Sequence, residues 1–84
     1  MPWHDYFWTD GMLNHLAEHG VTQEDFEWTV NYPNSEGRSR SQPDRLMAWG
    51  YTEDGRYIAC VYELLEDDMT VIPVTAYETR EPRG

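Results

Sequence analysis

Lysine is absent from this sequence, and only six of its 84 residues are basic, against sixteen acidic ones. The formal net charge is therefore −10. Such an excess of negative charge repels nucleic acid at long range and argues against a large nucleic-acid-binding surface. All six basic residues are arginines, however, and the planar, forked arginine side chain fits phosphate and carboxylate groups. The composition is therefore compatible with a small basic site on an otherwise acidic protein.

Cysteine and long hydrophobic runs are also scarce. Cys60 is the single cysteine, so no intramolecular disulfide can form, and its apolar neighbours favour a buried structural thiol over a reactive one. No apolar run approaches the roughly 20 residues of a membrane-spanning helix. The first residues do not resemble a signal peptide. We therefore expect a soluble, cytoplasmic protein that does not associate with membranes.

Several motifs of common enzymes are missing. The sequence has no glycine-rich phosphate loop, no C-x-x-C pair and no G-x-S-x-G turn, which argues against nucleotide-binding enzymes and serine hydrolases. Residues 15–19 do match H-x-x-E-H, which on a helix places two histidines one turn apart for zinc and a glutamate as base. A catalytic zinc site needs a third protein ligand, and Gly20 ends the expected helix directly after His19. We therefore predict neither a metal nor a cofactor.

Three strands joined by two tight turns are predicted in the second half of the chain, at residues 45–52, 57–65 and 69–77. The first turn contains Asp54-Gly55, a pair typical of primed hairpin turns, so the flanking strands should be antiparallel neighbours. Residues 57–65 are apolar almost throughout, which favours the centre of the sheet. Pro73 cannot donate a hydrogen bond within a sheet, and it predicts an edge position or a bulge in the last strand.

A short strand and two helices are predicted in the first half. Residues 5–8 are rich in aromatic side chains and indicate an edge strand. The spacing of apolar residues predicts a helix over 11–19 with Gly20 as its C-terminal cap. Thr22 and Asp25 resemble a capping box at the start of a second helix, which the sequence Tyr32-Pro33 ends.

These elements combine into one α+β domain over residues 1–84, in which a short N-terminal strand and two helices precede an antiparallel meander that the helices cover on one face. Residues from about 34 to 44 are predicted to be a flexible loop, and residues from about 79 to 84 a frayed tail. Arg38 and Arg40 in the loop are either solvated charges or an RNA-binding arm that holds phosphate.

Three further arginines flank the predicted strands. Arg45 opens the first strand, Arg56 opens the second and Arg80 follows the third. Together with Tyr77 and His19, they suit a metal-independent ribonuclease, in which arginine stabilises charge on the scissile phosphate and tyrosine or histidine moves a proton to or from the 2′-hydroxyl. The alternative is that they are ordinary surface arginines.

The order of the elements and several short motifs resemble the BrnT-type toxins of bacterial type II toxin–antitoxin systems, small relatives of the RelE-like ribonucleases. The resemblance spans the chain from Trp8 to about Glu81. It rests on His19-Gly20-Val21, Asp44-Arg45-Leu46-Met47-Ala48 with Gly50, Asp54-Gly55-Arg56, Cys60-Val61-Tyr62 and Val74-Thr75-Ala76. It implies a RelE-like fold and a metal-independent endoribonuclease acting on mRNA, with Arg45 as the best-supported site residue. It also implies a small cognate antitoxin protein that covers the active face.

The chain departs from that family at three positions. The family usually has arginine and lysine after the valine-threonine-alanine run, where this chain has Tyr77 and Glu78, and Glu18 stands where a basic residue commonly precedes His-Gly. These departures motivate a second hypothesis, a non-catalytic module of the same fold that binds a basic partner protein and exposes Trp49 and Tyr51. A third, which follows from charge alone, is an acidic mimic of nucleic acid. The sequence does not decide whether the chain assembles into a homo-oligomer.

Overall fold

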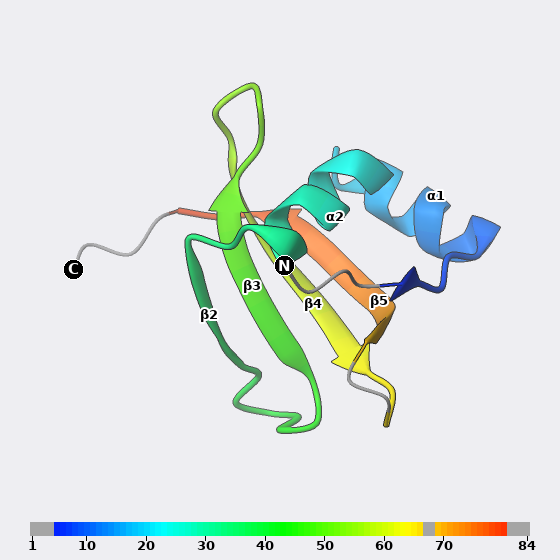
Figure 1. Cartoon of the computed structure of the whole chain (residues 1–84). Helices are drawn as coiled ribbons and strands as arrows, with labels where there is room; N and C mark the ends of the chain where they lie inside the picture. The colour runs from blue at the N-terminus through cyan, green and yellow to red at the C-terminus, as the bar shows by residue number, and fades with distance from the viewer. Residues whose placement is uncertain (1–4, 67–68, 81–84) are drawn as a thin grey trace.

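Two helices and five strands make up residues 5–66 and 69–80, the part of the chain that the computed structural model describes. In chain order they are β1 (Asp5–Tyr6), α1 (Asp10–Glu18), α2 (Gln23–Asn31), β2 (Ser35–Arg38), β3 (Leu46–Tyr51), β4 (Tyr57–Leu64) and β5 (Thr70–Glu78). The strands form one sheet in the order β1-β5-β4-β3-β2. Both helices pack on one side of it (Figure 1). The predicted α+β class, with two helices on one face of a sheet, is confirmed.

The sheet is mixed, whereas the sequence predicted a purely antiparallel one. β1 runs parallel to β5, with Asp5 opposite Thr70, and the other neighbouring strands are antiparallel. The predicted N-terminal strand of residues 5–8 is therefore real but shorter. It ends because Trp8 packs edge-on against Phe26 of α2, with ring centroids 5.4 Å apart. This contact directs the chain from the sheet into the helix layer.

Local hydrogen bonds set the ends of the helices. The Thr9 hydroxyl accepts a hydrogen bond from the backbone N–H of Met12 (3.1 Å) and so caps α1. Gly20, with φ at 73°, follows its C-terminal end. Thr22 and Asp25 form the predicted capping box of α2, because each side chain accepts a hydrogen bond from the backbone N–H of the other. The predictions of Gly20 at the end of α1 and of the capping box at the start of α2 are confirmed.

The β3–β4 hairpin closes with a three-residue loop. Gly55 N donates to the Thr52 carbonyl (3.0 Å), and Thr52 N donates to the Arg56 carbonyl (2.8 Å). Gly55 has φ at 86°, the left-handed conformation that completes a type I turn in such loops. The loop is thus one residue longer than a two-residue primed turn. The Thr52 hydroxyl stabilises it by donating to the Asp54 carboxylate and accepting from Arg56 N.

The predicted loop over residues 34–44 is partly wrong, because its first residues form β2. This strand pairs with β3 from Ser35 opposite Trp49 to Arg38 opposite Leu46. Serine, glutamate and glycine have low strand propensity, so pairing with β3 rather than local preference decides the structure. A Cβ on Gly37 would lie 3.2 Å from Cζ3 of Trp49, so this glycine leaves the space that the indole occupies.

The predictions about the centre of the sheet and about Pro73 are confirmed. β4 lies in the middle of the five strands. Along β5, Thr75 is opposite Val61 and Pro73 is opposite Tyr62, so Val74 is an extra residue and forms a bulge. The bulge lets the strand accommodate proline, which cannot donate a hydrogen bond.

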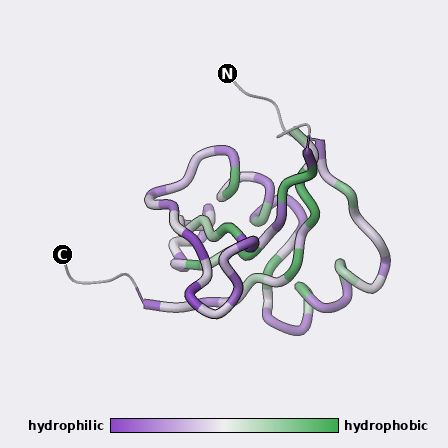
Figure 2. Tube along the Cα trace, turned by 90° about the horizontal axis from the view of Figure 1, so that it is seen from below, coloured by the Kyte–Doolittle hydropathy of each residue, from purple (hydrophilic) through white to green (hydrophobic). Residues whose placement is uncertain are grey.

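The hydrophobic core lies between the helices and one face of β3, β4 and β5. Figure 2 shows the hydrophobic stretches as short green segments separated by hydrophilic ones. The buried core residues are Leu16, Val21, Phe26, Val30, Ala48, Ile58, Cys60, Tyr62, Val71 and Ala76. Within residues 5–66 and 69–80, no helix has the length and apolar composition to cross a membrane.

Two predicted features lie partly outside the described residues. In the turn expected at residues 66–68, residues 67–68 are not described, and neither are residues 81–84 of the predicted tail. At the start of that tail, Thr79 N donates to the Tyr57 carbonyl (2.9 Å), so pairing with β4 continues one residue past β5.

Candidate functional site

Among residues 5–66 and 69–80, no helix packs on one face of the sheet. Successive side chains along a strand point to opposite sides, and Ala48, Ile58, Cys60 and Tyr62 point toward the helices. The side chains between them therefore point away. We call this surface the open face. It comprises Met47, Trp49 and Tyr51 of β3, Tyr57, Ala59, Val61 and Glu63 of β4, and Ile72, Thr75 and Tyr77 of β5.

Aromatic side chains dominate the open face. Trp49, Ala59 and Tyr77 lie side by side across three strands, and the small alanine between the two aromatic residues is fully buried. Tyr51 packs edge-on against Tyr57, with ring centroids 5.0 Å apart. Tyr51 and Tyr77 are 45% and 37% exposed, so part of this aromatic surface is available to a partner.

Arg45 lies at the margin of the open face. It directly precedes β3, and because Leu46 faces the helices, Arg45 falls on the opposite side. Its Nε lies 3.7 Å from Oε2 of Glu63, and both side chains are more than a third exposed. Solvent screens such a pair, so it contributes little to stability and can be exchanged for another partner.

Arg56 holds the hairpin loop to the helix layer. Its Nη1 donates to the Gly20 carbonyl (2.6 Å), its Nε donates to the Asp54 carboxylate (3.0 Å), and Nη2 lies 3.5 Å from the Asp25 carboxylate. Two hydrogen bonds hold the pKa of Asp54 below its usual value. The one from the Thr52 hydroxyl has the larger effect, and the one from Arg56 has the smaller effect. This arginine is a structural tie, and its polar atoms already have protein partners.

The structure does not bring the predicted ribonuclease residues to one point. Arg45 and Arg56 lie at opposite ends of β3 and β4, and the six residues of β3 between them span about 20 Å. Tyr77 is opposite Ala59, four positions along β4 from Glu63, the partner of Arg45. That separation is about 13 Å along the strand. A scissile phosphate bound by Arg45 is therefore remote from Arg56.

His19 and Arg80 lie at the end of the sheet that holds Arg56, because Arg56 donates to the carbonyl of Gly20 and Thr79 pairs with Tyr57. Arg38 and Arg40 lie in the segment before β3. His19 follows the end of α1, with its ring edge-on to that of His15 at 5.1 Å between centroids. Arg80 is exposed beyond the end of β5. In the segment after α2, Arg38 donates to the Pro43 carbonyl (3.2 Å), and Arg40 is exposed in the turn between β2 and β3.

The two histidines of the H-x-x-E-H motif do not form part of a larger ligand set. His15 Nε2 lies 2.8 Å from the Thr75 hydroxyl, which links α1 to β5. Among residues 5–66 and 69–80, no three histidine, cysteine, aspartate or glutamate side chains are grouped to hold a metal ion. Cys60 lies in the core, and burial raises the pKa of its thiol to about 12, so the predicted structural thiol is confirmed.

Sequence reasoning missed Glu63 as the partner of Arg45. The signal was present, because Glu63 is the one charged residue in the apolar run of β4 and its position places it on the open face. Comparisons of the chain with protein-family models, with curated proteins and with solved structures gave no match. The functional argument therefore rests on the residues of the site.

Proposed function

We propose that this chain is a protein-binding module that uses the open face to bind a basic partner protein. The observation that carries the proposal is the composition of this face. Apart from Glu63 and Thr75, the described residues that it takes from β3, β4 and β5 are apolar or aromatic, and none is basic. Aromatic and methionine side chains are enriched at protein interfaces, and an exposed apolar patch marks an interaction site.

The arrangement that we assign to the module is RelE/BrnT-like. The element order supports it, because a short strand and two helices precede three antiparallel strands, to which β2 adds an edge. Two quoted motifs lend further support, since Arg45 directly precedes β3 and Asp54-Gly55-Arg56 lies in the β3–β4 hairpin. The resemblance implies a cognate antitoxin as the partner.

The charge of the chain favours a basic partner. With a net charge of −10, two copies of this chain repel each other, whereas a chain rich in lysine and arginine is attracted. We expect an apolar centre on the partner to cover Tyr51 and Tyr77 and a basic residue at its margin to replace Arg45 beside Glu63. Association should slow steeply with added salt, because complementary charge acts mainly on the association rate.

The second candidate is a metal-independent endoribonuclease acting on mRNA. It is favoured by the position of Arg45 on the same face as Trp49 and Tyr77, whose rings offer stacking surfaces for bases. An RNA phosphate would replace Glu63 as the partner of Arg45. This candidate is the weaker one, because Arg56 is engaged by Gly20, Asp54 and Asp25.

A matched pair of double variants tests the binding proposal. Tyr51→Ala with Tyr77→Ala removes the exposed rings of the open face. Trp28→Ala with Tyr32→Ala removes a similarly exposed aromatic pair from the helix side, with ring centroids 4.6 Å apart. The partner is first recovered by co-purification from the native host, and its Kd is then measured with purified proteins.

We expect the open-face double variant to weaken binding by about tenfold or more, because exposed tyrosines are typical interface anchors. The control double variant should change Kd by less than about twofold. Equal losses in the two variants would refute the open face as the binding site.

For the second candidate, purified protein is incubated with mRNA. Cleavage that Arg45→Ala abolishes and that the Arg56→Lys variant retains would establish the ribonuclease instead.

A further inference from the structure

The outer edge of β2 offers backbone groups for pairing with another strand. β2 is the last strand on its side of the sheet, and none of the other strands that the structure describes lies beyond it (Figure 1). Ser39 N donates to the Arg45 carbonyl (2.9 Å), which continues the pairing of β2 with β3. Inward and outward bonds alternate along an antiparallel strand, so Gly37 bonds to β3, whereas the N–H and C=O groups of Glu36 and Arg38 point outward. Both of these residues are exposed.

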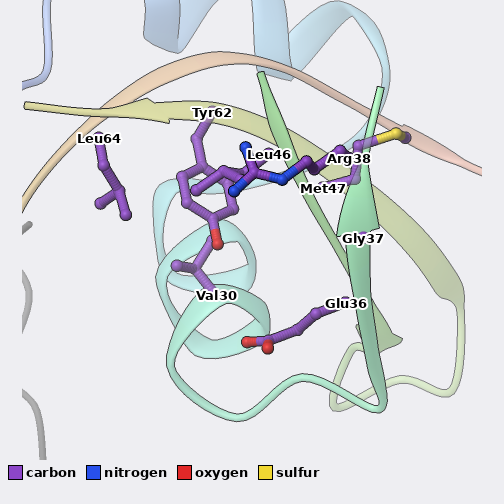
Figure 3. A pocket seen from close by; sticks show the side chains of 8 residues that line it. All are labelled: Val30, Glu36, Gly37, Arg38, Leu46, Met47, Tyr62 and Leu64. Carbon is purple, nitrogen blue, oxygen red and sulfur yellow. The ribbon is translucent and has the colours of Figure 1, made fainter. Parts of the chain in front are cut away.

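The two residues with outward backbone groups carry opposite charges. Glu36 and Arg38 lie two positions apart, so their side chains extend to the same side of β2, where both line the groove beside Tyr62 (Figure 3). Neither forms an ion pair with a residue that the structure describes. Arg38 makes one exposed hydrogen bond, to the Pro43 carbonyl (3.2 Å). The edge therefore presents one available charge of each sign.

Antiparallel pairing of two β2 edges about a two-fold axis at Gly37 matches these charges. In this register, Glu36 of each copy lies opposite Arg38 of the other copy. The hydrogen-bonding pattern agrees, because both residues of each pair point outward and can exchange two backbone hydrogen bonds. A shift by one residue would place outward groups opposite inward ones. A shift by two residues would place glutamate opposite glutamate or arginine opposite arginine, which destabilises a sheet.

We propose that this chain forms a two-fold symmetric homodimer in which the β2 edges pair and join the two sheets into one. A two-fold interface requires a surface that is complementary to itself, and the order Glu36-Gly37-Arg38 meets this requirement. Oppositely charged residues that face each other on neighbouring strands stabilise the pairing. The β2 edge is separate from the open face, so this proposal does not rest on the function proposed above.

The net charge of the chain gives this dimer a distinctive dependence on salt. Two chains with a net charge of −10 repel each other at long range. Raising the ionic strength from about 0.01 M to about 0.15 M shortens the screening length from about 30 Å to about 8 Å, which screens this repulsion more than the contacts between facing side chains. The dimer should therefore tighten with salt, whereas binding of the basic partner should weaken.

Sedimentation equilibrium of the full chain measures dimerisation at protein concentrations up to about 1 mM. We expect a dimer whose Kd falls as salt is added. Amide hydrogen exchange, followed by NMR at low and high protein concentration, locates the contact. The amides of Glu36 and Arg38 should become protected as the concentration rises, whereas that of Gly37 should be protected at both concentrations. A chain that stays monomeric at about 1 mM, or protection that arises away from β2, would overturn the proposal.

Charge-swap variants test the pairing of Glu36 with Arg38. Glu36→Arg places arginines opposite each other and Arg38→Glu places glutamates opposite each other, so each variant should weaken dimerisation by about tenfold or more. The double variant with both changes restores unlike pairs at the same net charge, and its Kd should lie within about twofold of the wild-type value. A mixture of the two single variants should form a heterodimer, because every arginine then faces a glutamate.

Glu53→Arg is the matched control for Glu36→Arg. It makes the same change of charge in the exposed hairpin loop, away from β2. Because it reduces the net negative charge, it should leave the dimer as tight as that of the wild type or tighter. Equal weakening by Glu36→Arg and Glu53→Arg, or a mixture of the two single variants that stays monomeric, would refute the proposed pairing.

Discussion

Replacing Arg56 with methionine tests whether this residue is a structural tie or part of an active site. The side chain is 31% exposed and reaches Asp25, Asp54 and the Gly20 carbonyl. The hydrogen bond to the carbonyl is charge-assisted and short, and it is worth about 1.5 kcal/mol. The ion pair with Asp25 adds about 0.5 kcal/mol. We assign no stabilising free energy to the contact between Arg56 and Asp54, because the Asp54 side chain is exposed to solvent.

The Arg56→Met variant should therefore lose about 2 kcal/mol of unfolding free energy, which for a chain of this length lowers Tm by roughly 10 °C. Thermal unfolding followed by circular dichroism measures the shift. Arg56→Lys should be intermediate, because a single ammonium group can bind the Gly20 carbonyl or Asp25 but cannot match the fork of arginine. Arg45→Met is the control. Its one ion pair is exposed and 3.7 Å long, so Tm should change by less than about 2 °C.

The opposite pattern would refute this reasoning. If Arg56→Met unfolds at the wild-type temperature, the three contacts do not tie the hairpin to the helices. If in addition the variant loses RNA cleavage that the wild type performs, Arg56 is a functional residue and the ribonuclease candidate gains support. Equal Tm losses in Arg56→Met and Arg45→Met would show that charge, rather than the contacts of Arg56, matters for stability.

Three further predictions concern single positions. Cys60 should resist alkylation at neutral pH, since its thiol is buried with a pKa of about 12; rapid labelling of the folded protein, detected by mass spectrometry, would contradict this. Gly37→Ala should cost about 1–2 kcal/mol, because the new methyl group meets the Trp49 ring at 3.2 Å, whereas Gly11→Ala in α1 meets no atom closer than 3.8 Å and should be neutral or stabilising by up to about 1 kcal/mol. Both are checked by urea unfolding. The folded-state pKa of Asp54 lies below the ordinary value of 3.8, so its stabilising effect is present above that value and is lost as pH falls through the lower, folded-state pKa. The stability advantage of the wild type over Asp54→Asn should therefore vanish in acid, and an advantage that grows as the pH falls would contradict it.

Signals that lie within a few residues predicted this fold well. The capping box of Thr22 and Asp25, the glycine of the β3–β4 loop and the bulge at Pro73 each depend on local backbone geometry. Each can be recognised without knowing what packs nearby. The apolar run of β4 likewise indicates a central strand, because a strand with neighbours on both edges buries most of its side chains, as β4 does from Tyr57 to Tyr62.

The features that the sequence did not predict depend on pairing between distant residues. β2 forms because Ser35–Arg38 lies beside β3 and because Gly37 leaves room for Trp49. Arg56 loses its availability through a hydrogen bond to Gly20, 36 positions earlier in the chain. No local pattern reveals either contact. The sequence correctly placed Arg45 and Arg56 at strand ends, but the ends are opposite ones, which becomes evident only from the antiparallel pairing of β3 with β4.

The end of α2 shows how a local signal has a consequence that is not local. Tyr32-Pro33 ends α2, as the sequence predicts, and one more helical turn would extend the helix by about 5 Å toward the open end of the sheet. Tyr62 lies on the same side of the sheet as the helices, since Cys60 two positions earlier in β4 faces them. The chain instead turns after the proline into β2, and Glu36 and Arg38 of this strand line the space beside Tyr62 (Figure 3). The early end of one short helix therefore leaves this space, and the strand that follows it brings one charge of each sign to its wall.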